Sequence, residues 1–195
     1  MTPVLPSLFM KIILKSLLIT LLAIATFSLT ACSIGVGGLQ RYLDSGDGYQ
    51  FLYPNGWVPV DVKNASAGVD VVFRDLIETT ENLSVIISDV TKNKTLTELG
   101  TPSEVGVRFL KKINDDPNSD RQAELLSADQ HENDGKIYYV LEYLVKLPNN
   151  QERHDLASVT VNRGKLVTFN LSTPEKNWDK VKSLFETSAQ SFTVF

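Results

Sequence analysis

The chain has 195 residues, 43% of them hydrophobic, with 19 basic and 23 acidic side chains, two histidines and one cysteine. This length predicts one globular domain. A single cysteine excludes an intramolecular disulfide and a Cys-x-x-Cys zinc or redox site. The acidic balance, with a pI near 5.2, argues against nucleic acid as the main partner, because phosphate binding requires a basic face.

Residues 1–31 have the composition of a signal peptide. Lys11 and Lys15 are followed by an uncharged run, Ser16 to Ala31, which is shorter than the about 20 apolar residues that span a bilayer. Met10 directly precedes Lys11 and is an alternative translation start to Met1. Removing residues 1–31, which contain two basic residues and no acid, leaves 17 basic and 23 acidic side chains and a net charge of −6.

The apolar run ends in Leu29-Thr30-Ala31-Cys32, which resembles the lipobox of bacterial lipoproteins. In such proteins the cysteine is acylated and becomes the new N-terminus, and two or more acyl chains anchor stably where one does not. We therefore expect lipidation at Cys32, a short tether over residues 32–38 and a folded domain over residues 39–195. The alternative is an ordinary secretory signal followed by an incidental buried cysteine.

The first half of the expected domain contains four β-rich runs separated by turn residues. They cover residues 49–53, 58–62, 69–74 and 83–90. A helix follows, because Thr101, Pro102 and Glu104 provide an N-cap, a proline at the first helical position and a capping-box partner. Apolar residues then repeat at four-residue spacing from Val105 to Ile113.

The second half predicts an antiparallel meander and a final helix. The expected strands cover residues 123–133, 136–146, 153–162 and 165–172, with tight turns at Asp134-Gly135 and Arg163-Gly164. The second of these strands is apolar on both faces, so both faces of the sheet should be covered. A helix starting at Thr173, with an apolar stripe from Trp178 to Phe192, provides one cover. We predict an α+β fold, an α-β-α sandwich with a central antiparallel sheet flanked by helices.

The search for catalytic chemistry finds no recognisable motif. The sequence lacks a Gly-x-Ser-x-Gly elbow and a His-Glu-x-x-His helix, which favours a protein that is not an enzyme. A catalytic triad is defined by spatial geometry that one sequence does not display, so a hydrolase stays a distant alternative.

Metal binding is the more open question. His131, Glu132 and Asp134 lie at an expected hairpin tip, and His154 and Asp155 lie near the start of a strand. Imidazoles beside carboxylates suit zinc or a similar divalent ion, although solvated strand ends have the same composition. The run from Asp116 to Asp120 begins like a calcium loop. It continues with Arg121 in place of the required glycine and Ser127 in place of the bidentate glutamate, which argues against an EF-hand site.

Two polar groups are candidates for partner contact. The first is a connection between two strands that contains Asp75, Glu78, Glu81 and Asn82, and the second is the basic pair Lys111 and Lys112. For both groups the alternative is ordinary solvated surface. Trp57, which follows the turn Pro54-Asn55-Gly56, is expected in the core rather than at a docking surface.

Several motifs extend over almost the whole of the expected mature chain. They are Asp47-Gly48-Tyr49-Gln50-Phe51-Leu52-Tyr53-Pro54-Asn55-Gly56-Trp57, Val71-Val72-Phe73-Arg74-Asp75, Thr80-Glu81-Asn82-Leu83-Ser84-Val85, Leu99-Gly100-Thr101-Pro102, and Arg163-Gly164-Lys165-Leu166-Val167-Thr168-Phe169-Asn170 followed by Trp178. Together they resemble the PsbP family of photosystem II extrinsic proteins. With the lipobox, the similarity is to the cyanobacterial lipoprotein members of that family.

This resemblance implies a PsbP-like, Mog1-like α-β-α sandwich and a role that is not enzymatic. It implies a position on the lumenal side of the thylakoid membrane, held there by the lipid anchor. The implied partners are photosystem II reaction-centre subunits, and the implied role is assembly or stabilisation of the reaction centre and oxygen-evolving complex.

The resemblance also bears on bound ions. Family members are linked with calcium, chloride and manganese, and the cyanobacterial type with zinc, so zinc or calcium is the implied cofactor. The plant proteins use an N-terminal extension in ion retention, whereas this chain has the anchor and a few residues there. The alternative function is a lumenal carrier or sensor of zinc, manganese or calcium built around His131 or His154.

Overall fold

A computed structural model describes residues 38–62, 68–90, 94–117 and 119–195. Residues Gly38–Phe195 form one compact unit. The expected signal peptide (residues 1–31), the expected lipidation site Cys32 and all of the expected tether except Gly38 lie outside the described residues. None of the helices in the described ranges is long and apolar enough to cross a membrane.

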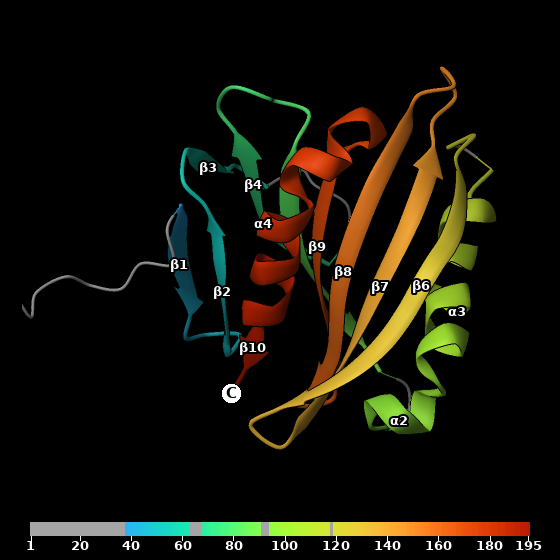
Figure 1. Ribbon diagram of the computed structural model, residues 1–195. Helices are drawn as coiled ribbons and strands as arrows, with labels where there is room; N and C mark the ends of the chain where they lie inside the picture. The colour runs from blue at the N-terminus through green and yellow to red at the C-terminus, as the bar shows by residue number, and fades with distance from the viewer. Residues whose placement is uncertain (1–37, 63–67, 91–93, 118) are drawn as a thin grey trace, which may run out of the picture. The chain divides into compact units, whose positions relative to one another are not determined.

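The unit is built from two antiparallel sheets and a small number of helices (Figure 1). The smaller sheet has the strand order β1-β2-β10, and the larger has the order β3-β4-β5-β9-β8-β7-β6. The elements along the chain are β1 (Leu39–Asp44), β2 (Tyr49–Pro54), β3 (Trp57–Val60), β4 (Val69–Asp75), β5 (Asn82–Asp89), α2 (Leu96–Leu99), α3 (Pro102–Asn114), β6 (Gln122–Asn133), β7 (Lys136–Lys146), β8 (Glu152–Asn162), β9 (Lys165–Pro174), the 3₁₀-helix η2 (Glu175–Asn177), α4 (Trp178–Ser191) and β10 (Thr193–Val194).

The meander β6–β9 confirms the expected strands to within two residues. Its two tight turns place consecutive residues at positive φ, with Asp134 at 50° and Gly135 at 72°, and Arg163 at 49° and Gly164 at 74°. Such pairs form turns whose twist matches that of the flanking strands, which fixes the register of the hairpins. His131 thereby lies opposite Tyr138, and Leu144 lies opposite His154.

The two faces of the larger sheet contribute to separate hydrophobic clusters. Tyr138 belongs to the cluster under α4, and the next residue, Tyr139, belongs to the cluster under α2 and α3. Leu156 and Ala157 divide in the same way, as alternation along a strand requires. An α+β fold with a large antiparallel sheet is therefore confirmed, with helices packed on opposite faces. Trp57 lies in the first cluster, as expected.

The predicted start of α3 is confirmed in detail. The Thr101 side chain accepts a hydrogen bond from the Glu104 amide at 3.3 Å, and Glu104 Oε2 accepts one from the Thr101 amide at 2.8 Å. This capping box satisfies backbone donors that the first turn leaves unpaired. The final helix differs from the prediction, because β9 extends to Pro174 and the 3₁₀-helix η2 precedes α4, which begins at Trp178.

The smaller sheet and α2 were not predicted. The strand over residues 49–53 pairs with β1 and β10 in the smaller sheet, rather than joining the central one. The turn between β1 and β2 brings Gly48 against the C-terminal segment, where the Phe195 amide donates a hydrogen bond to the Gly48 carbonyl at 2.8 Å. A Cβ at Gly48 would lie 2.7 Å from the Phe195 carbonyl oxygen, and its φ of +74° also favours glycine.

Candidate docking loop and histidine sites

The connection between β4 and β5, residues 76–81, presents two large apolar side chains to solvent. Leu76 is 60% exposed and Ile77 is 96% exposed. Both follow Asp75, whose Oδ1 accepts hydrogen bonds from the Ile77 amide at 2.5 Å and the Glu78 amide at 3.0 Å. This side-chain turn is a common local use of aspartate. We call residues 76–81 the docking loop.

The docking loop is fixed at its far end by buried polar contacts. Glu81 is 6% exposed, and its Oε1 accepts from Thr173 Oγ1 at 2.9 Å and from Asn177 Nδ2 at 3.3 Å. Arg153 Nη2 donates to the Thr80 carbonyl at 2.7 Å. The exposed apolar pair is therefore held by hydrogen bonds to β8, β9 and η2.

These contacts refine the predicted partner residues of this segment. Asp75 and Glu81 shape the docking loop, and Asn82 Nδ2 donates to the Thr80 carbonyl at 3.3 Å. Glu78 is partly exposed, and a hydrogen bond from Thr80 Oγ1 lowers the pKa of its carboxyl group. Glu78 therefore adds a negative charge beside Leu76 and Ile77. Leu76 and Ile77 themselves were not among the predicted partner residues.

The other predicted partner residues lie near the C-terminal end of α3. Lys111 forms an exposed ion pair with Asp115, one helical turn further on. Exposed pairs of this kind contribute little to stability, because water screens them and both side chains lose freedom. Lys112 instead lines a cleft on one side of α3.

His154 contacts other side chains through both ring nitrogens and through one face of its ring. Its imidazole stacks on Trp178 with ring centroids 3.7 Å apart. Nδ1 lies 2.7 Å from Glu175 Oε2, and Nε2 lies 2.8 Å from Glu142 Oε1. Both ring nitrogens are thus occupied by hydrogen bonds, and the arrangement leaves neither free to ligate a metal ion.

Asp155 points to the opposite face of the sheet from His154, because successive strand residues alternate. It is buried, and its Oδ1 accepts from Asn170 Nδ2 at 3.0 Å, while Tyr143 Oη donates to Asn170 Oδ1 at 2.9 Å. Burial raises the pKa of the Asp155 carboxyl group. The structure therefore does not bring His154 and Asp155 together as ligands of one ion.

His131 occupies a third environment. Its ring stacks on Tyr138 at 5.2 Å, its Nε2 is buried without a hydrogen-bond partner, and burial lowers its pKa. Glu132 follows it on the strand and is exposed on the other face, and Asp134 forms the turn. The partners of His131 and His154 on β7 are six residues apart, roughly 20 Å along the strand, so the histidines do not share a site.

One group of three metal-ligating side chains occurs within 4.8 Å among the residues that the structure describes. It consists of Asp44, Asp47 and Asp70, none of which the sequence analysis proposed. Asp44 Oδ1 already accepts from the Gly46 amide at 2.8 Å and the Asp47 amide at 2.9 Å, and Asp70 accepts from Tyr49 Oη. Burial and the two neighbouring carboxylates raise the pKa of Asp47.

Comparison with known proteins places the fold and the motifs in one family. The PsbP family model matches residues 37–194. CyanoP of Synechocystis sp. is 63% identical over 179 residues, covering 91% of this chain and 94% of that protein. CyanoP of Thermosynechococcus vestitus is 49% identical over 180 residues, covering 90% and 96%.

The solution structure of Synechocystis CyanoP has a TM-score of 0.71 and 62% identity, and 86% of this chain matches 99% of that one. The matching domain of Synechocystis CyanoP is therefore folded in solution without further chain. The Saccharomyces cerevisiae Ran-binding protein Mog1p, at a TM-score of 0.53 and 13% identity, shares the fold alone. On the family model and the identity to CyanoP, the chain belongs to the PsbP family.

Proposed function

We propose that this chain is a lipid-anchored extrinsic protein on the lumenal side of the thylakoid membrane, without catalytic activity. It binds photosystem II subunits and assists assembly or stabilisation of the reaction centre and oxygen-evolving complex. Membership of the PsbP family and the identity to CyanoP support this role. The observation that carries the binding step is the exposed apolar pair, Leu76 and Ile77, on a hydrogen-bonded loop.

The docking loop has the physical properties of a binding element. An exposed isoleucine and leucine side by side gain free energy when a partner removes them from water, about 1.5–3 kcal/mol for each side chain fully buried. Because the loop is already ordered by Asp75, Glu81 and Arg153, little conformational freedom remains to be lost on binding. Glu78 beside the pair favours a partner surface with an apolar pocket and a cation at its rim.

The test compares two exposed apolar sites in the membrane-anchored protein. The double variant Leu76→Ser, Ile77→Ser removes the apolar pair, and Val107→Ser, at a residue of α3 that is 59% exposed, is the control. Each chain replaces the native copy in a cyanobacterium, and solubilised thylakoids are separated on native gels. We expect the double variant to bind photosystem II intermediates at least about tenfold more weakly than the control, from the apolar burial lost.

Two results would contradict the proposal at different levels. If the double variant and the control both co-migrate with photosystem II like the wild type, the docking loop is not the contact. If the wild-type protein migrates freely at every stage of assembly, the photosystem II role itself is wrong.

The anchor is tested separately. Cys32→Ser removes the only thiol that can be acylated, so the processed protein should be released from membranes by a high-salt wash that leaves the wild type bound. Mass spectrometry of the wild-type N-terminal peptide should show acyl groups on Cys32, and an unmodified cysteine in membrane-bound protein would contradict lipidation.

A further inference from the structure

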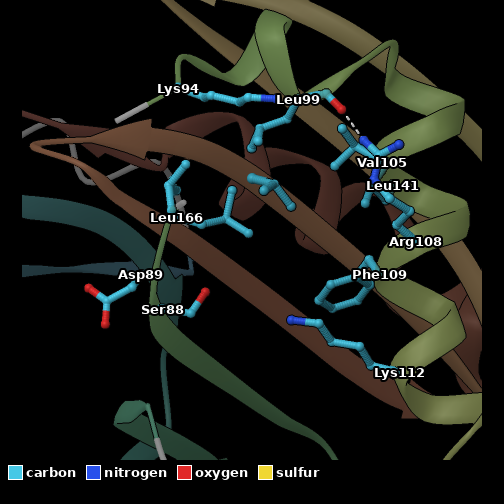
Figure 2. A pocket seen from close by; sticks show the side chains of 12 residues that line it. Ser88, Asp89, Lys94, Leu99, Val105, Arg108, Phe109, Lys112, Leu141 and Leu166 are labelled. Carbon is cyan, nitrogen blue, oxygen red and sulfur yellow. Dashed lines mark hydrogen bonds between the residues drawn. The ribbon is translucent and has the colours of Figure 1, made fainter. Parts of the chain in front are cut away.

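A cleft of about 480 Å³ opens on the face of the larger sheet that α2 and α3 cover (Figure 2). It runs along α3 from Val105 to Lys112 and is bounded on the other side by the end of β5 and the beginning of β9. Its apolar wall is formed by residues of helix and sheet, namely Leu99, Val105, Phe109, Leu141, Val159 and Leu166. The volume and the mainly apolar lining are those of pockets that take one small organic molecule.

The cleft exists because the helix cover is narrower than the sheet. α3 packs mainly against β6 and β7, at one end of the strand order, and leaves part of the sheet beside β8 uncovered. At the far wall, β5 contributes the small side chain of Ser88, which lies opposite Leu166 of β9. A small residue here keeps the space open where a larger one would fill it.

The rim of the cleft is positively charged in a protein that is acidic overall. Lys94, Arg108 and Lys112 line it, and all three are exposed. The single acid among the lining residues, Asp89, has its carboxylate 2.5 Å from Lys165 Nζ and is compensated there. The formal charge of the whole chain is −4, so this local excess of cations runs against the average.

The three cations are not equivalent. Arg108 Nη2 donates to the Leu99 carbonyl and thereby ties α3 to the end of α2. In Figure 2 the Lys112 side chain extends past Phe109, with its amine directed across the cleft towards Ser88. Within the described residues neither Lys94 nor Lys112 forms an ion pair within 4 Å. The Lys112 amine therefore remains available to an anion at the edge of an apolar space, whereas Lys94 interacts electrostatically with the Glu98 carboxylate.

We propose that this cleft binds a single amphipathic carboxylate of the fatty-acid class, taken up as a free molecule. Its hydrocarbon body lies on Val105, Phe109 and Leu166, and its carboxylate pairs with Lys112 at the rim. Charge complementarity selects the anionic head, and the apolar wall selects the chain. The site is separate from the docking loop and does not depend on the proposed role at photosystem II.

The experiment titrates residues 38–195 with dodecanoate below its micelle concentration. Calorimetry should show one binding site, and amide shifts in ¹H–¹⁵N spectra should concentrate at Ser88, Val105 and Lys112. Dodecanol, which has the same chain without the charge, should bind about tenfold or more weakly, since a hydrogen bond to a charged group is lost.

Paired variants locate the head and the body of the ligand. Lys112→Glu should weaken dodecanoate binding about tenfold or more, whereas Lys111→Glu, which changes charge equally on the neighbouring residue outside the cleft, should leave it within about twofold. Ser88→Phe should fill the cleft and abolish binding while the protein stays folded by circular dichroism. No binding by the wild type, equal binding of dodecanol, or equal effects of the two lysine variants would each overturn the proposal.

Discussion

The two faces of the larger sheet are covered by different means. On one face α4 and the smaller sheet enclose an aromatic cluster, in which Phe169 lies 4.7 Å from Phe51 and 5.4 Å from Phe192 between ring centroids. On the other face α3 covers mainly β6 and β7, and the rest of this face contains the cleft and the buried polar group around Asp155.

This difference separates stability from binding within one domain. A closed aromatic cluster stabilises the fold through its large buried surfaces and favourable ring contacts. An incompletely covered face has fewer neighbours for each side chain, but it provides space for a ligand and polar groups whose charge state depends on pH. We therefore expect mutations on the two faces to differ in size and in character.

The largest expected effect is at the centre of the aromatic face. Phe169 is fully buried, and Phe169→Ala would leave a cavity that the rigid rings around it do not fill. We expect a loss of about 3–5 kcal/mol in the free energy of unfolding. Urea denaturation followed by tryptophan fluorescence measures it, and a loss below about 1 kcal/mol would show that this face is loosely packed.

A smaller loss is expected at a fully buried residue beside the cleft. Leu141 packs under α3, near Gly106 and Leu125, and also lines the cleft. The space created by Leu141→Ala joins an opening that already reaches solvent. We therefore expect a loss of about 2 kcal/mol in the free energy of unfolding, at the low end for a substitution of this kind. If the same urea experiment gives a loss as large as that of Phe169→Ala, the two faces are equally closed.

The smallest expected change concerns pH. Burial raises the pKa of Asp155, so the folded protein keeps this proton at pH values where the unfolded chain has lost it. Stability should therefore fall as pH rises from the unfolded Asp pKa, near 3.9, through the higher folded pKa. Asp155→Asn removes this loss and can still accept from Asn170. Its stability relative to wild type should rise across that window, and parallel pH profiles would contradict this prediction.

The sequence predicted most of the larger sheet because its signals are local. The turns at Asp134-Gly135 and Arg163-Gly164 and the capping box at Thr101 are fixed by neighbouring residues. The smaller sheet depends on pairing between Gln50 and Thr193, almost the whole domain apart, and β10 is only two residues long. So short a strand has no measurable periodicity, and its pairing is decided by tertiary contacts.

The candidate site was predicted less well, for two physical reasons. The histidine clusters were grouped by proximity in sequence, yet neighbours on a strand face opposite sides, which separates His154 from Asp155 and His131 from Glu132. In the docking loop, the polar residues were selected as contacts. The structure adds to them two adjacent large apolar residues, Leu76 and Ile77, within a turn, where exposure is costly without a partner.

The pairing of β2 with β10 also has a consequence for how the protein is made. Because β10 follows every other element of the domain, a polypeptide that is still being synthesised contains β1 and β2 without the strand that completes their sheet. The Val194 amide also donates to Tyr138 Oη at 3.1 Å, so the last strand connects both sheets. Completion of the native structure must wait for this last segment, and a truncated product without β10 would expose the unpaired backbone of β2.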